Sequence, residues 1–133
     1  MKRIQVILAV VLPLAVAAVV PAVSDPQGPS YAQDVERVIV KRCAGCHTAD
    51  KPKAELILEQ GRGYGLLVGR NSKEVPTLPL VKPGDPDGSY LWRKLQHTAS
   101  EGKGMPRTLF GSKKLPRKEL ALIRSWIETG ALP

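Results

Sequence analysis

The spacing of apolar residues predicts a helix near residue 35 of the chain. Val35, Val38 and Ile39 share one face at helical spacing, and Asp34 before them is a residue type that caps helices. Lys41 and Arg42 suit the C-terminal half of such a helix, where cations are favoured. We therefore expect the helix to run into the segment that begins at residue 43.

A second helix is predicted at the C-terminal end, where the pattern is most regular. Its apolar residues recur at three- and four-residue steps: Leu120, Ile123, Trp126 and Ile127. Pro116 suits the first turn of this helix, and Gly130 suits its end.

Between these helices the chain is rich in glycine and proline. A helix is predicted over residues 90–96, capped by Asp87 or Ser89, with Leu91, Trp92 and Leu95 as its apolar stripe. A shorter helical piece is expected at residues 54–60, and residues 75–88 read as a turn-rich connection. Glycine-rich loops are predicted at residues 61–65 and 102–111. No segment alternates as a strand does, so the predicted fold class is all-α.

The N-terminal residues have the layout of a secretory signal. Lys2 and Arg3 precede an almost wholly apolar run over residues 4–23. Small residues suitable for cleavage occur at Ser30–Ala32, the preferred site, and at Pro21–Ala22, the second choice. We expect a signal peptide at residues 1–32, or an uncleaved membrane anchor over residues 4–23, followed by one small domain at residues 33–133. Either arrangement predicts an exported protein, in the bacterial periplasm or otherwise outside the cytoplasm.

The net positive charge of the chain bears on which partners it is expected to bind. It carries a formal +8, and residues 33–133 hold 18 Lys and Arg against 11 Asp and Glu. The cations are scattered without interleaved aromatic residues, so nucleic acid is not an expected partner. Two interpretations stay open: steering toward redox proteins with acidic docking surfaces, or solubilising charge. Membrane association is expected only if the N-terminal segment is retained.

The chain's only two cysteines form the segment Cys43-Ala-Gly-Cys46-His47. Two thiols at this spacing, followed directly by histidine, form the attachment pattern of c-type haem: the thiols bond the porphyrin and the imidazole binds the iron. A dithiol redox site would need a neighbouring strand–helix–strand pattern, and a zinc site would need ligands beyond His97, the other histidine. An ordinary disulfide would be strained in so short a loop.

Laid out in order, these segments resemble a class I c-type cytochrome, from about residue 33 to the end of the chain. The resemblance rests on the Cys43–His47 motif behind a helix, Met105-Pro106 in a late loop, and the terminal helix. Segments 82–92, 104–106 and 125–131 further resemble the planctomycete-type subgroup. The resemblance implies a small fold whose first and last helices pack together, with Val38 or Ile39 near Trp126, and whose loops enclose one haem.

The resemblance also implies roles for individual residues. Cys43 and Cys46 would carry one covalent haem c, His47 would bind its iron, and Met105 would be the sixth ligand, with His97 as the competitor. Apart from the resemblance, ring N–H and O–H groups make Trp92, Trp126, Tyr64 and Tyr90 candidate propionate partners, with the hydrophobic core as the alternative and the preferred one for Trp126. Other candidates are Arg62, Arg70 and Arg93. The expected function is one-electron transfer by a carrier that is not an enzyme; the alternatives are a gas-binding sensor and a peroxidase-like protein with a labile sixth ligand.

Overall fold

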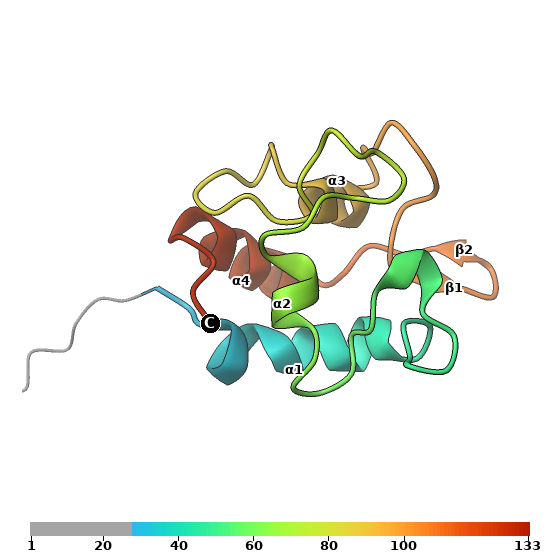
Figure 1. The fold of residues 1–133 in the computed structure, drawn as a ribbon, viewed down its shortest axis with the longest axis horizontal. Coiled ribbons are helices and arrows are strands. Elements are labelled where there is room, and N and C mark those ends of the chain that lie inside the picture. Colours follow the sequence, from blue (N-terminus) through green and yellow to red (C-terminus); the bar gives the residue numbers. More distant parts are fainter. Residues whose placement is uncertain (1–27) are drawn as a thin grey trace, which may run out of the picture.

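The computed structural model describes residues 28–133 (Figure 1). The apolar run at 4–23 and the Pro21–Ala22 site lie outside these residues, as do residues 1–27 of the predicted signal; the last part of that signal, residues 28–32, lies within them. No helix within 28–133 is both long enough and apolar enough to cross a membrane.

The first helical segment coils continuously from Tyr31 to Ala44, with π-type turns at Tyr31–Val35 and Val40–Ala44 on either side of α1 (Glu36–Ile39). Ser30 is its N-cap: the Ser30 hydroxyl accepts a hydrogen bond from the Gln33 amide at 3.2 Å. Asp34 was expected to cap this helix, but its carboxylate instead accepts from the Ser30 amide at 3.0 Å. The helix therefore begins four residues earlier than expected, and the predicted domain boundary at residue 33 falls inside it.

Helix α4 (Arg117–Glu128) lies beside this first segment (Figure 1). Pro116 occupies the N-cap position, just before the first turn, and Gly130 follows the last turn with a left-handed φ of 105°. The Tyr31 and Trp126 rings pack 5.6 Å apart between centroids, which joins the two ends of the chain. The Tyr31 amide also donates to the Leu132 carbonyl at 2.9 Å.

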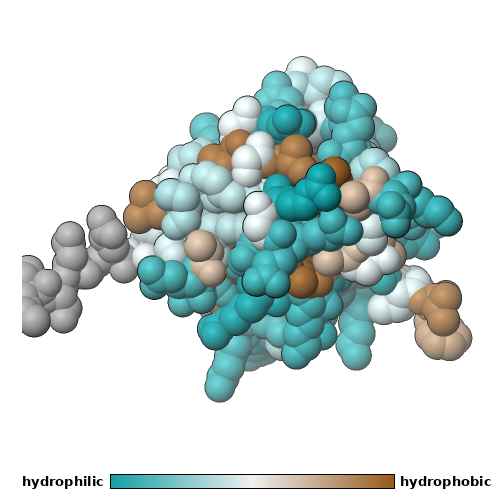
Figure 2. Space-filling view, turned by 60° about the horizontal axis from the view of Figure 1, so that its bottom comes forward, coloured by the Kyte–Doolittle hydropathy of each residue, from teal (hydrophilic) through white to brown (hydrophobic). Residues whose placement is uncertain are grey.

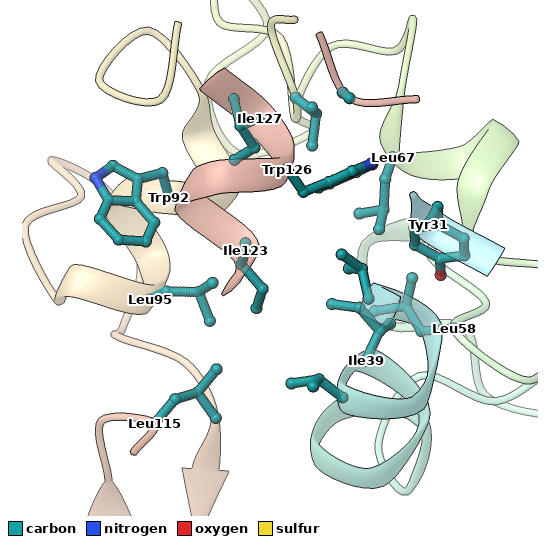
Figure 3. Packing of buried hydrophobic residues seen from close by; sticks show 14 residues of the cluster. Tyr31, Ile39, Leu58, Leu67, Trp92, Leu95, Leu115, Ile123, Trp126 and Ile127 are labelled. Carbon is teal, nitrogen blue, oxygen red and sulfur yellow. The ribbon is translucent and has the colours of Figure 1, made fainter. Parts of the chain in front are cut away.

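The buried cluster between these helices contains the predicted apolar residues (Figure 3). Val35, Ile39, Ile123, Trp126 and Ile127 are at most 1% exposed. Trp126 belongs to the same cluster as Val38 and Ile39, as the resemblance implies. Helical periodicity predicted this core because both helices bury one continuous face.

Two short helices stand between the terminal ones. Helix α3 (Tyr90–Gln96) has the predicted bounds, and Ser89 is its N-cap residue, although the Ser89 hydroxyl bonds Lys82 and Asp85 instead of the helix. Helix α2 (Tyr64–Leu67) begins within the glycine cluster. The prediction of a helix at 54–60 is wrong. The chain forms only a 3₁₀ turn at Lys53–Glu55, and no helix continues from it because Ala54 and Glu55 adopt left-handed φ values.

The late glycine-rich segment contains an antiparallel hairpin that the sequence did not predict. Strands β1 (Arg107–Thr108) and β2 (Gly111–Ser112) pair Arg107 with Ser112 and Thr108 with Gly111. Two-residue strands are too short to produce a visible alternation of apolar and polar residues. The hairpin is the exception to the all-α expectation, and it leaves Leu109 and Phe110 at its tip.

Candidate functional site

A cavity of about 880 Å³ is lined by residues at the end of the first helical segment and by residues of the β1–β2 hairpin. Cys43, Cys46 and His47 line it from one part of the chain, and Met105 lines it from another, 58 residues after His47. Leucine side chains form most of the remaining apolar lining: Leu56, Leu58, Leu67, Leu80, Leu91 and Leu109. The structure thus brings all four predicted site residues to one apolar cavity.

The Cys43–His47 segment extends the first helix by a turn. The Cys46 amide donates to the Cys43 carbonyl at 3.1 Å, and the His47 amide donates to the carbonyls of Cys43 and Ala44. Both thiols are free. Burial, and then the neighbouring Cys46, raises the pKa of the Cys43 thiol to about 12. Because the thiolate is the nucleophile in thiol–disulfide exchange, a thiol of this pKa is poorly suited to dithiol redox chemistry at neutral pH.

The His47 ring is held in one orientation by the backbone. Its Nδ1 lies 3.1 Å from the Lys53 carbonyl oxygen. Because a carbonyl only accepts, Nδ1 carries the proton in this bond, and the Nε2 lone pair is left for another partner. Burial lowers the pKa of His47, which favours the neutral ring. Metal-binding histidines commonly have this arrangement, with the second nitrogen donating to a backbone carbonyl.

Two backbone hydrogen bonds hold Met105 against the C-terminal end of α3. Its amide donates to the Lys94 carbonyl at 2.9 Å. Its carbonyl oxygen lies 3.1 Å from Nε2 of His97. The Met105 side chain lines the cavity from this fixed backbone. A thioether at this position can act as a soft ligand.

His97 lies behind Met105, and it is not among the described residues that line the cavity. It caps α3 with a left-handed φ of 62°, and its ring packs so close to Gly104 that a Cβ there would clash with it. Its Nε2 proton is donated to the Met105 carbonyl, so that nitrogen has no free lone pair. Of the two predicted candidates for the sixth ligand, Met105 lines the cavity and His97 does not.

An ion pair between a buried lysine and a more exposed glutamate forms part of the cavity wall. The Lys94 side chain is 7% exposed; its Nζ pairs with the Glu74 carboxylate and donates to the Glu101 carbonyl at 3.1 Å. The Tyr90 hydroxyl donates to Glu74 at 2.9 Å. Desolvation pushes the pKa of Glu74 upward, but the hydrogen bonds from Lys94 and Tyr90 hold it below its ordinary value. Because both charged groups have hydrogen-bond partners, the pair holds a polar group at a fixed position in the cavity wall.

Most of the expected propionate partners point elsewhere. Trp126 donates to the Leu132 carbonyl at 2.8 Å, and the Tyr64 hydroxyl donates to the Ala131 carbonyl at 3.1 Å. Arg62 pairs with Glu59, and Arg93 donates to the Asp87 carbonyl. Of the seven candidates, only Tyr90 is among the cavity-lining residues.

Other basic side chains reach the cavity and were not singled out from the sequence. These are Arg42, Lys53, Lys73, Lys94 and Arg107. Arg42 is bound by a bidentate ion pair to Glu119 of α4, at 2.7 and 2.8 Å. The sequence could have indicated that Arg42 lies at the site, because Arg42 directly precedes Cys43. It gave no sign that Lys94 is buried in the cavity wall, since charged residues on a short helix are ordinarily exposed.

The residues present fit a c-type haem. The cavity volume lies in the range of cofactor sites, and its lining is apolar with a few fixed polar groups. Two free thiols, a neutral imidazole with an available nitrogen and a thioether supply the donor set that such a haem needs. Within residues 28–133, no group of three or more His, Cys, Asp and Glu side chains is arranged to hold a metal ion directly.

Comparison with known proteins gives no match: no family model, no curated protein and no solved structure is similar to this chain.

Proposed function

We propose that this protein is a one-electron carrier that holds a single covalent haem c in the cavity. The observation that carries the proposal is the convergence of Cys43, Cys46, His47 and Met105 on one apolar cavity of about 880 Å³. Helix formation alone accounts for the first three being together, but not for a methionine that lies 58 residues farther along the chain.

Each residue has a definite task under this proposal. Cys43 and Cys46 hold the porphyrin covalently, and His47 donates its Nε2 lone pair while the Lys53 carbonyl fixes the ring. Met105 donates its thioether from a backbone held by Lys94 and His97. The bound haem supplies the ferric–ferrous couple, which methionine ligation and burial shift toward the reduced form. The surrounding leucines exclude water.

Two side-chain ligands would leave no position for a substrate, which favours a carrier over an enzyme or a gas sensor. The protein would then work outside the cytoplasm, where c-type haem is attached to exported chains. Because Tyr31 belongs to the core, we favour processing at Pro21–Ala22 over processing after Ala32. The cationic surface would steer weak, rapid encounters with acidic redox partners.

Expression in a host with haem-attachment machinery tests the proposal. We expect the chain to gain the mass of one haem, and a Cys43→Ser, Cys46→Ser variant to gain none. The ferric protein should show a weak far-red absorption band that disappears in Met105→Ala and remains in His97→Ala. A chain without covalent haem contradicts the proposal. Loss of the band only in His97→Ala would reassign the sixth ligand, and ready carbon monoxide binding by the ferrous protein would favour a gas-binding function.

A further inference from the structure

The tip of the β1–β2 hairpin exposes two large apolar side chains. Leu109 is 98% exposed and Phe110 is 100% exposed. Figure 1 shows the hairpin reaching out from one end of the molecule, and in Figure 2 a hydrophobic projection stands away from the body at the same end. Two adjacent large apolar side chains that are this exposed, at the tip of a projection, indicate an interaction site.

The hairpin is held in this shape by hydrogen bonds within and below it. The Thr108 hydroxyl accepts from the Phe110 amide at 3.2 Å and donates to the Gly111 carbonyl at 3.0 Å. At the base, the Ser112 hydroxyl donates to the Gly104 carbonyl at 2.6 Å. The tip therefore presents its two apolar side chains from a defined turn.

The charged residues of the sequence on either side of the tip, between Glu101 and Glu119, are all cationic. Residues 102–118 hold six Lys and Arg and no Asp or Glu: Lys103, Arg107, Lys113, Lys114, Arg117 and Lys118. All six are exposed, and within residues 28–133 none of them pairs with a carboxylate. A surface that attracts this segment must therefore be anionic as well as able to accept apolar side chains.

We infer that the hairpin docks the protein on an anionic lipid surface, with Leu109 and Phe110 entering the interface and the flanking cations binding phosphate headgroups. A protein partner would ordinarily cover a broad patch with an apolar centre and a polar rim. Here the apolar part is a narrow projection with cations behind it, which suits a fluid interface that needs no shaped pocket. This inference does not depend on the presence of haem.

Docking in this way would also orient the cavity. Arg107, Thr108 and Leu109 are exposed and line the cavity, so the cavity reaches the surface at the hairpin. A docked molecule would hold that opening at the lipid surface, where a carrier could exchange electrons with membrane-bound partners.

Binding of the full chain to vesicles of phosphatidylglycerol or phosphatidylcholine tests the inference. The readout is amide hydrogen exchange over residues 107–114, because the apolar run at residues 4–23 can bind vesicles by itself. We expect protection of this segment on phosphatidylglycerol only. Leu109→Ser with Phe110→Ser should raise the phosphatidylglycerol concentration at which this segment is half protected by about tenfold or more. Arg107→Gln, Lys113→Gln and Lys114→Gln should each raise that concentration by about fivefold.

The matched control removes three exposed charges elsewhere, as Arg37→Gln, Lys41→Gln and Arg70→Gln together. It should leave the protection of the hairpin in place; an equal loss would mean that net charge alone binds the vesicles, and would overturn the inference. Absence of protection on phosphatidylglycerol would also overturn it. Protection by polyglutamate but not by vesicles would do the same and assign the hairpin to an acidic protein.

Discussion

The helical side of the molecule, formed by residues 31–44 and α4, is stabilised differently from the cavity side, formed by the residues that line the cavity. The helical side packs apolar side chains, and among its buried polar atoms the Tyr31 hydroxyl has no partner within the described residues. The cavity side buries the charged Lys94 and satisfies it with Glu74 and the Glu101 carbonyl. The stability of the helical side depends on how well its apolar side chains fill the interior. The stability of the cavity side depends on individual polar contacts between distant segments.

The largest effect is expected on the helical side. Trp126→Ala removes a fully buried ring that joins α4 to Tyr31, and should lower the free energy of unfolding by about 3–5 kcal/mol. Leu91→Ala on the cavity side should cost only about 1–2 kcal/mol, because Leu91 is half-buried. Urea unfolding followed by circular dichroism measures both. Equal losses would contradict the distinction between the two sides.

A smaller effect, with a characteristic pH dependence, is expected for Glu74→Gln. The change leaves the buried Lys94 cation without its carboxylate, at a cost of about 2 kcal/mol near neutral pH; the cost is at the low end because Glu74 is 39% exposed. The pKa of Glu74 is lowered from its ordinary 4.5, so the stabilisation is present above pH 4.5 and is lost as pH falls through the folded-state value.

The difference between wild type and Glu74→Gln should therefore shrink on acidification below pH 4.5. Glu59→Gln is a suitable control, since it removes a carboxylate from a more exposed pair with Arg62 and should cost less than about 1 kcal/mol. A constant difference between wild type and Glu74→Gln across this pH range would show that the carboxylate charge does not stabilise Lys94.

Two tyrosine substitutions should have opposite signs on the two sides. Tyr31→Phe removes a buried hydroxyl without a hydrogen-bond partner, so stability should rise by about 1 kcal/mol. Tyr90→Phe removes a hydroxyl that donates its single proton to Glu74 at 2.9 Å, so stability should fall by about 1 kcal/mol. Thermal unfolding of both variants gives the comparison directly. A loss of stability in Tyr31→Phe would indicate that its hydroxyl has a hydrogen-bond partner after all.

The sequence predicted the helical side well and the cavity side only in part. The faces of the first helix and α4 follow from apolar periodicity, a local signal that Val35, Ile123 and Trp126 obey. The start of the first helix was placed too late because Tyr31 is buried by Trp126, a contact between residues 95 positions apart. No local pattern reports such a contact.

The sequence predicted the site residues that belong to a recognisable motif. It did not predict the residues whose place at the site depends only on a contact between distant segments. Cys43, Cys46 and His47 form a motif, and Met105 could be named because it is the only methionine after Met1. The burial of Lys94 depends on Glu74, which lies 20 residues earlier in an irregular loop. The position of His97 behind Met105 depends on a left-handed turn at the end of α3. Neither pairing has a signature in sequence.

A small effect on stability, but the most specific effect on the site, is expected at His97. His97→Ala removes the hydrogen bond to the Met105 carbonyl and should cost about 1 kcal/mol. If Met105 binds iron, its release by added imidazole should become easier by about fivefold, a change equivalent to that cost. His97→Gln, whose amide can donate to the same carbonyl, should recover most of the resistance to imidazole. Thr98→Ala is the matched control: Thr98 is the next residue and is exposed, so its substitution should leave imidazole binding unchanged. Equal imidazole affinity in His97→Ala and wild type would show that the Lys94 carbonyl alone is enough to hold Met105 in place.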